Sequence, residues 1–257
     1  VFRAVGSTSN CASPILILNT AVAQQLARFK KDVDALIEKD VKKDEAIFQT
    51  LRAYITESKA ILFEGNGYGE EWHTEAEQRG LKAVNSVPEA FKAYLLPESQ
   101  KMFTDFSVLT TRELEARFEI KNETFIKKLQ IESRVLGDMA INHIIPTAIA
   151  YQNVLIANVK GIKDLFGADS MDMATSQMRS LEKLSKHINA VNEKVYKMID
   201  ERKRANAIDD IAERAEAYNT YILPYMDSIR VHIDKLEMII DNELWSLPKY
   251  RELLFIH

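Results

Sequence analysis

The sequence predicts an all-α protein: an elongated helical bundle with an antiparallel heptad hairpin, preceded by a short strand and loop. Three observations support this prediction. Apolar residues recur three and four positions apart along most of the chain, which is the period of an amphipathic helix. Only 8 glycines and 6 prolines occur in 257 residues, so few tight turns interrupt the elements. Two consecutive segments in the C-terminal part carry apolar seams with heptad spacing.

The opening stretch, VFRAVGSTSNCASP, differs from all that follows. Residues 1–5 are β-branched and aromatic and end at Gly6, so they are the one strand candidate. Ser13 and Pro14 then form a helix start, a capping side chain followed by a proline at the first helical position. The helix that follows is expected to place these apolar residues on one inward face: Ile15, Leu18, Val22, Leu26, Phe29, Val33 and Leu36.

A second helix is expected over about 43–62, followed by a loop and several short helices. Three glycines within FEGNGYGEEW, residues 63–72, predict that the loop turns sharply. The next helix is expected to stop at Gly80, and Pro88 and Pro97 each open another short helix. The residues of the second helix expected to face inward are Ile47, Leu51, Tyr54, Ile55 and Ile61.

A long helix begins at a capping box formed by Thr110 and Glu113. Its pattern continues until Gly167 ends it, a length of more than about 80 Å if the helix were straight. Pro146 lies within this stretch. Because proline removes a hydrogen bond and clashes with the preceding turn, a kink or break is expected there.

Two heptad helices are predicted over about 171–204 and 207–241. Only a few residues around Asn206 link them, so they are expected to pair antiparallel. Pro224 is expected to kink the second of them, and a final short helix follows Ser246 and Pro248. The predicted core of this hairpin consists of Leu184, Ile188, Val191, Val195, Ile211, Ala215, Tyr218 and Ile222.

Composition excludes several function classes. The net charge of −4 and the pI of about 5.8 leave no general basic surface for nucleic acid or for an anionic membrane. The longest apolar runs, such as residues 15–18, are far too short to span a bilayer. Cys11 is the single cysteine, which excludes an internal disulfide and suits a reducing compartment. We therefore expect a cytoplasmic protein without nucleic-acid or membrane partners.

The residues by themselves show no familiar catalytic motif: no phosphate loop, dinucleotide fingerprint or nucleophile elbow. Glu70 and His73 have the spacing of half a di-iron site, but such a bundle needs a second motif and further carboxylates. A metal bundle is therefore the weakest hypothesis. His143 is expected to donate to carbonyls that Pro146 frees. The charged run at 201–204 is better explained as a complement to a helix dipole than as a nucleic-acid contact.

Five stretches, in matching order, resemble the large type III glutamine synthetases. They are FRAVGSTSNCASP at 2–14, FEGNGYGEEW at 63–72, LEARFEI at 114–120, IESRVLGDMAINHIIPTAIAYQN at 131–153 and LPKYRELLF at 247–255. The resemblance spans essentially the whole chain. It implies that residues 1–42 are the end of an α/β catalytic domain and that residues 43–257 are a helical C-terminal domain.

The family joins ammonia to glutamate with ATP, through a γ-glutamyl phosphate and with Mg²⁺ or Mn²⁺ at the site. The resemblance implies that Arg3 contacts the glutamate substrate, where a guanidinium holds a carboxylate through two hydrogen bonds. From the residues alone, a structural salt bridge of Arg3 is the preferred reading. The family pattern has a metal-binding glutamate two positions before this arginine, and here that position is Val1. No catalytic residue and no metal ligand is therefore assigned.

Two function hypotheses follow. In the first, the chain is the C-terminal part of a bacterial glutamine synthetase that forms a homo-oligomer. ATP and the metal then belong to the parent enzyme, and this part alone is mainly structural and inactive. In the second, the chain is a stand-alone helical protein-interaction module without catalytic activity. An upstream catalytic domain in the complete gene would decide for the first hypothesis.

Overall fold

The computed structural model describes residues 10–67, 69–81, 84–167, 172–249 and 252–254. The strand predicted at residues 1–5 lies outside these ranges. The described residues are predominantly helical and include no strand, in agreement with the predicted fold class. The chain divides into two compact units, residues 1–118 and 119–257. The boundary predicted after residue 42 concerns the end of a catalytic domain and stays a prediction.

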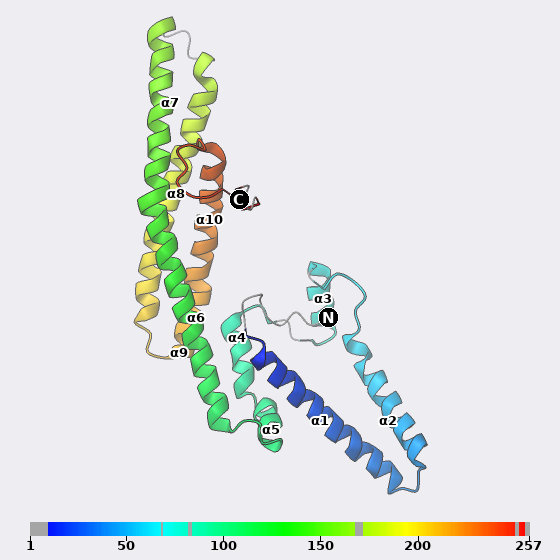
Figure 1. Cartoon of the computed structure of the whole chain (residues 1–257). Helices are drawn as coiled ribbons and strands as arrows, with labels where there is room; N and C mark the ends of the chain where they lie inside the picture. Colours follow the sequence, from blue (N-terminus) through cyan, green and yellow to red (C-terminus); the bar gives the residue numbers. More distant parts are fainter. Residues whose placement is uncertain (1–9, 68, 82–83, 168–171, 250–251, 255–257) are drawn as a thin grey trace. The chain divides into compact units, whose positions relative to one another are not determined.

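The first unit contains the long helix α1 and several shorter helices (Figure 1). α1 and α2 pack side by side, and the Phe29 ring meets the Tyr54 ring edge-on at 6.0 Å between centroids. Asp40, with φ of 62°, lies in the turn between them. The elements are α1 (Ala12–Ile37), α2 (Lys43–Glu57), the 3-10 turn η1 (Ser58–Ile61), α3 (Glu70–Gln78), α4 (Val87–Phe91), the 3-10 turn η2 (Lys92–Leu95), α5 (Pro97–Asp105) and the start of α6 (Thr111–Met139).

α1 begins at Ala12, earlier than predicted. Cys11 is its N-cap residue and makes no capping hydrogen bond through its side chain. The Ala12 N–H donates to Asn10 Oδ1 at 2.8 Å. The prediction that Ser13 caps the helix is therefore wrong. The N–H groups of the whole first turn lack helical partners, so Pro14 fits at the third position as well as at the first. The predicted stop at Gly80 is confirmed, since this residue follows α3 with φ of 73°.

The core of the first unit is small, and the inward faces predicted for its first two helices are only partly right. Phe103, Leu109 and Leu114 are buried, with Leu16 and Ile17 of α1 packed against them. The main neighbours of α1 within the described unit are α2 and α5, and they cover other parts of its surface. The predicted inward residues that are exposed instead are Ile15, Leu18, Val22, Leu26, Leu51, Ile55 and Ile61.

The second unit is a bundle of three long antiparallel rods (Figure 1). The first rod is the rest of α6, the π-helical turn η3 (Ala140–Ile144) and α7 (Ile145–Phe166). The second rod is α8 (Thr175–Asn206), and the third is α9 (Ile211–Ala217), the π-helical turn η5 (Tyr218–Ile222) and α10 (Leu223–Ile239). Both α7 and α10 pack on α8. The 3-10 turn η6 (Glu252–Leu254) follows near the C-terminus.

The two prolines inside the rods follow π-helical turns, and neither interrupts its rod. Pro146 and Pro224 each lie two residues after such a turn. The N–H of Ile145 bonds Ala140 O, five residues back, and the N–H of Leu223 bonds Tyr218 O in the same way. The wider turn accommodates a residue that lacks an N–H and crowds the preceding carbonyl. The expected disturbance is thus a π turn at each proline, and a break does not occur.

The predicted heptad hairpin is confirmed, and a third rod completes its core. Leu184, Val191, Val195, Ala215, Tyr218 and Ile222 are fully buried, whereas Ile188 and Ile211 are half-buried at the edge. Ala140, Ile144 and Ala148 of the first rod belong to the same core. The sequence prediction paired the two heptad helices with each other and did not foresee this third partner.

The segment after α10 folds back on that helix. Lys249 Nζ donates to the carbonyls of Glu237 at 2.8 Å and Ile240 at 3.3 Å, where cations complement a helix C-terminus. Trp245 is buried against the core. Where a short helix is expected after Ser246, the described residues include the 3-10 turn η6, and the Lys249 N–H donates to Glu252 Oε2 at 3.2 Å. Among the described residues, no helix is both long and apolar enough to cross a membrane.

Candidate functional site

Arg3, for which the sequence predicts a substrate contact, lies outside the described residues, as does Val1. The role of Arg3 therefore stays a prediction. The described residues present three polar groupings with possible functions: the start of α6, the glycine-rich loop before α3, and a histidine pair on α8 and α10.

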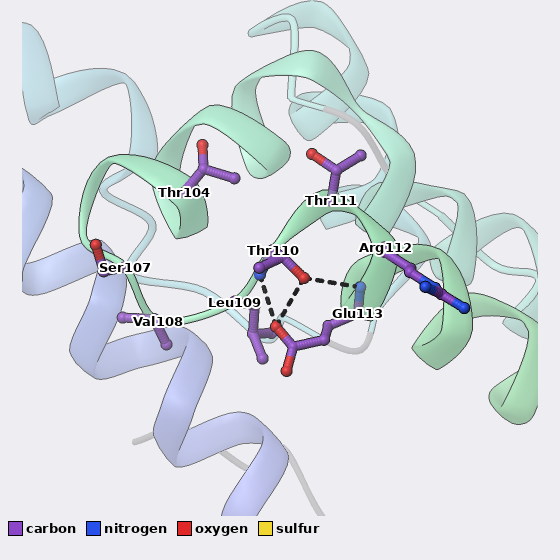
Figure 2. A pocket seen from close by; sticks show the side chains of 8 residues that line it. All are labelled: Thr104, Ser107, Val108, Leu109, Thr110, Thr111, Arg112 and Glu113. Atoms are coloured by element: carbon purple, nitrogen blue, oxygen red, sulfur yellow. Dashed lines mark hydrogen bonds between the residues drawn. The ribbon is translucent and has the colours of Figure 1, made fainter.

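The start of α6 lies beside a pocket of about 530 Å³ (Figure 2). The capping box predicted there is confirmed: Glu113 Oε2 accepts from the N–H and the hydroxyl of Thr110, each at 2.8 Å. The Glu113 N–H donates to Thr110 Oγ1 at 3.3 Å. The lining residues are Thr104, Ser107, Val108, Leu109, Thr110, Thr111, Arg112 and Glu113.

The electrostatics of this pocket support a structural role. The hydrogen bonds from the backbone and hydroxyl of Thr110 lower the pKa of Glu113, so its carboxylate is held charged at the helix N-terminus. A substrate anion would have to displace that carboxylate. Arg112 is directed away from the Thr110–Glu113 contact (Figure 2). The pocket therefore holds a helix cap, in which the Thr110 hydroxyl and the Glu113 carboxylate are engaged with each other.

The glycine-rich loop is shaped by an aromatic pair. The rings of Phe63 and Trp72 pack with centroids 4.3 Å apart. A Cβ atom on Gly65 would come within 2.5 Å of Phe63 Cζ, so a larger residue here would displace the Phe63 ring. Arg79 donates to the carbonyls of Ala60 and Leu62 and so ties the loop to the end of α3. These contacts give the loop a defined scaffold.

The metal hypothesis gains no support from the loop. Glu70 and His73 lie one turn apart on α3. Across the described ranges, no three His, Cys, Asp or Glu side chains are grouped so that they could hold a metal ion. The described residues thus do not fit the Mg²⁺ or Mn²⁺ that the resemblance implies for a complete enzyme.

The histidine pair joins two rods of the second unit. His187 Nδ1 of α8 and His232 Nδ1 of α10 are 3.0 Å apart, with ring centroids separated by 5.2 Å. One ring donates its N–H to the other, so the pair can share a proton but cannot carry a proton on both facing nitrogens. Partial burial lowers the pKa of both imidazoles, and Lys186 lowers both further. The pair is a pH-sensitive contact within the hairpin.

The remaining sequence candidates have local roles. His143 is exposed and makes no hydrogen bond within the described chain, so the prediction that it donates to freed carbonyls is wrong. The π turn directs Ala140 and Ile144 into the core and leaves His143 outside. In the charged run at the end of α8, Arg204 pairs with Glu201 at 2.6 Å. Cys11 is exposed and free.

The histidine pair was not predicted, although the sequence contains a signal for it. His187 precedes Ile188 and His232 precedes Ile233, so both histidines adjoin seam positions of the two helices predicted to pair. Register between the two seams would have brought them together. That register depends on the length of the α8–α9 link and on the π turn η5, neither of which the heptad pattern specifies.

Comparisons with known proteins find the chain similar to glutamine synthetases. Residues 46–163 match the family described as glutamine synthetase C-terminal domain. The chain is 45% identical over 255 residues to a glutamine synthetase of Bacteroides fragilis (strain YCH46), covering 99% of this chain and 35% of that protein. It is 29% identical over 260 residues to the type-3 glutamine synthetase of Dictyostelium discoideum, covering 99% and 35%.

A glutamine synthetase of Butyrivibrio fibrisolvens is 29% identical over 211 residues, which cover 82% of this chain and 30% of that protein. The chain thus spans about a third of the length of the relatives it matches. Residues 46–163 thus match the glutamine synthetase C-terminal domain family, and nearly the whole chain is similar in sequence to glutamine synthetases, a type-3 enzyme among them.

Proposed function

We propose that the chain is the C-terminal part of a type III glutamine synthetase. The observation that carries this proposal is the 45% identity to a glutamine synthetase along 99% of the chain. In the proposed reaction, the γ-carboxylate of glutamate takes the γ-phosphoryl group of ATP, and ADP leaves. Ammonia then displaces phosphate from the γ-glutamyl phosphate to give glutamine. The Mg²⁺ or Mn²⁺ and the ATP are bound by other parts of the enzyme.

Within that enzyme we assign residues 119–257 a structural role in a cytoplasmic, bacterial homo-oligomer. The three-rod bundle supports this assignment, because its rods share one apolar core and are joined by a histidine contact. The expected consequence is that the purified 257-residue chain forms no glutamine from glutamate, ammonia and ATP. Measurable glutamine formation by this chain would overturn the proposed division of roles.

Arg3 is the proposed contact to the glutamate carboxylate. In the complete enzyme, Arg3→Ala removes a charge-assisted hydrogen bond worth about 1.5–3 kcal/mol, which lowers kcat/KM for glutamate about tenfold or more. The KM for ATP should change little. Arg3→Lys should recover only part of the loss in kcat/KM, because a lysine ammonium cannot donate the two parallel hydrogen bonds of a guanidinium. If the glutamate kinetics of Arg3→Ala are unchanged, Arg3 does not contact the substrate, and its role is a structural salt bridge.

The second candidate function, a stand-alone interaction module, is favoured by one observation. Ile15, Val22 and Leu26 are 50%, 57% and 63% exposed on the same side of α1. Sedimentation velocity of the purified chain and of its Val22→Glu and Leu26→Glu double variant tests this candidate. Association of the parent that the double variant loses, in a chain encoded without a catalytic domain, would favour the module over the enzyme.

A further inference from the structure

Two arginines of the second unit, Arg134 on the first rod and Arg202 on α8, occupy matching positions in the register of the two rods. Gln130 Nε2 of α6 donates to Asn206 Oδ1 of α8 at 3.4 Å. Seven residues further along α6, a Cβ atom on Gly137 would lie 3.5 Å from Val195 Cγ1 and 3.7 Å from Met198 Cε. The two helices therefore run antiparallel in a steady register.

The same register continues beyond the π turn, where Gln152 Nε2 donates to Ser185 Oγ at 2.8 Å. One turn after Gln130 comes Arg134, and one turn before Asn206 comes Arg202. The register thus brings the two arginines opposite each other.

Neither arginine pairs with a carboxylate in the described chain. Arg202 is half-buried, and its Nη1 is buried without a hydrogen-bond partner. The acidic residues on the same end of α8 are taken by other cations: Asp200 by Lys203 at 3.0 Å and Glu201 by Arg204 at 2.6 Å. Arg134 is exposed and forms no ion pair among the described residues.

The surroundings add positive charge. Tyr218 of η5 is fully buried, and its hydroxyl donates to Asn206 Oδ1 at 2.7 Å. Burial and the like charge of Arg134 lower the pKa of Arg202. Burial raises the pKa of Tyr218, and the charges that oppose this are those of Arg202, Arg134 and Arg214. Arg214 is held nearby because its Nε donates to the Ile208 carbonyl at 2.8 Å.

This arrangement favours an anion. A buried guanidinium donor that lacks an acceptor is destabilising, and a second arginine opposite it adds like-charge repulsion. Planar guanidinium groups match the spacing of oxygens in carboxylates and phosphates, and two of them can hold one oxyanion from both sides. We propose that Arg134 and Arg202 form a binding site for a small oxyanion of the phosphate or carboxylate class.

In this site the exposed Arg134 forms the entrance, and the half-buried Arg202 supplies the inner donors. Asp138, one turn beyond Arg134, does not fill the site and accepts from Asn142 Nδ2 at 2.6 Å. The proposal gives the helical unit a ligand of its own, whichever reaction the complete enzyme performs.

Isothermal titration calorimetry of the 257-residue chain tests the site, with inorganic phosphate as the first probe in chloride buffer at constant ionic strength. We expect saturable binding that Arg202→Gln and Arg134→Gln each weaken about tenfold or more, the loss of one charge-assisted hydrogen bond. The matched control is Arg204→Gln, which changes an exposed arginine of the same helix and should leave the affinity unchanged. Free glutamate as a second probe separates a carboxylate ligand from a phosphate ligand.

Thermal unfolding is a second measurement, which keeps the test valid if Arg202→Gln, a change at a half-buried residue, does not fold. Without anion, Arg134→Gln should melt at the same temperature as the parent or higher, because the repulsion with Arg202 is gone. Phosphate should raise the melting temperature of the parent and of Arg204→Gln but not that of Arg134→Gln. If neither probe binds the parent saturably, or if Arg134→Gln binds as the parent does, the proposal is wrong.

Discussion

Leu184→Ala should strongly destabilise the second unit. Leu184 lies on α8, is fully buried and belongs to the core that all three rods share. The change removes three carbon groups at about 0.8 kcal/mol each, roughly 2.4 kcal/mol in total. A residual cavity of roughly 80 Å³ adds about 2 kcal/mol at about 24 cal/mol per Å³. The free energy of unfolding should therefore fall by about 3–5 kcal/mol.

The loss is measurable as thermal unfolding of the second unit alone. The chain has 2 tryptophans, and Trp245 is buried in this core whereas Trp72 lies in the first unit. In a Trp72→Phe background, tryptophan fluorescence therefore reports on the second unit. For a domain of this size, the expected loss lowers Tm by roughly 10–20 °C.

The matched control is Leu165→Ala on α7, since the Leu165 side chain is 79% exposed. A surface change of this kind should shift Tm by no more than about 2 °C. If the Tm of Leu184→Ala lies within about 2 °C of that of the control, Leu184 is not buried in a core shared by three rods. The packing assigned to the hairpin and the first rod would then be wrong.

Two further predictions concern contacts between the rods. The pKa of both His187 and His232 is lowered, so the unfolded chain binds more protons than the folded chain below the usual histidine pKa of about 6.5. Stability is then full above that pH and declines as the pH falls through it. His232→Gln should flatten the dependence of Tm on pH between about pH 7 and pH 5, and a slope equal to that of the parent would contradict this. At Gly137 an added Cβ meets Val195 and Met198 at ordinary contact distance. Gly137→Ala should therefore raise Tm through its better helix propensity, worth about 1 kcal/mol, whereas Gly137→Leu should lower it by overpacking. If Gly137→Ala and Gly137→Leu lower Tm equally, the prediction for Gly137→Ala is wrong.

The parts of the fold that sequence reasoning predicted are those with local causes. The capping box at Thr110 and the stop at Gly80 depend on residues within one turn of chain. The heptad seam of α8 predicted a buried stripe, and Leu184, Val191 and Val195 are fully buried. The fold class followed from the same periodicity.

The errors have causes that a local pattern does not contain. Ser13 does not cap α1, because the first turn tolerates proline at more than one position. The apolar stripe at Ile15 and Val22 is exposed although its spacing is that of a buried face. Periodicity reports which residues share a face, but neighbouring elements decide whether that face is covered.

The candidate sites show the same division. The sequence by itself determined the family resemblance and the helical class, because residue order and periodicity are properties of the chain. It also marked Arg3 as the residue to test. Only the tertiary structure brought His187 to His232 and Arg134 opposite Arg202, which lie 45 and 68 positions apart. Such pairs depend on the register between rods, and register is set by packing, link length and the two π turns together.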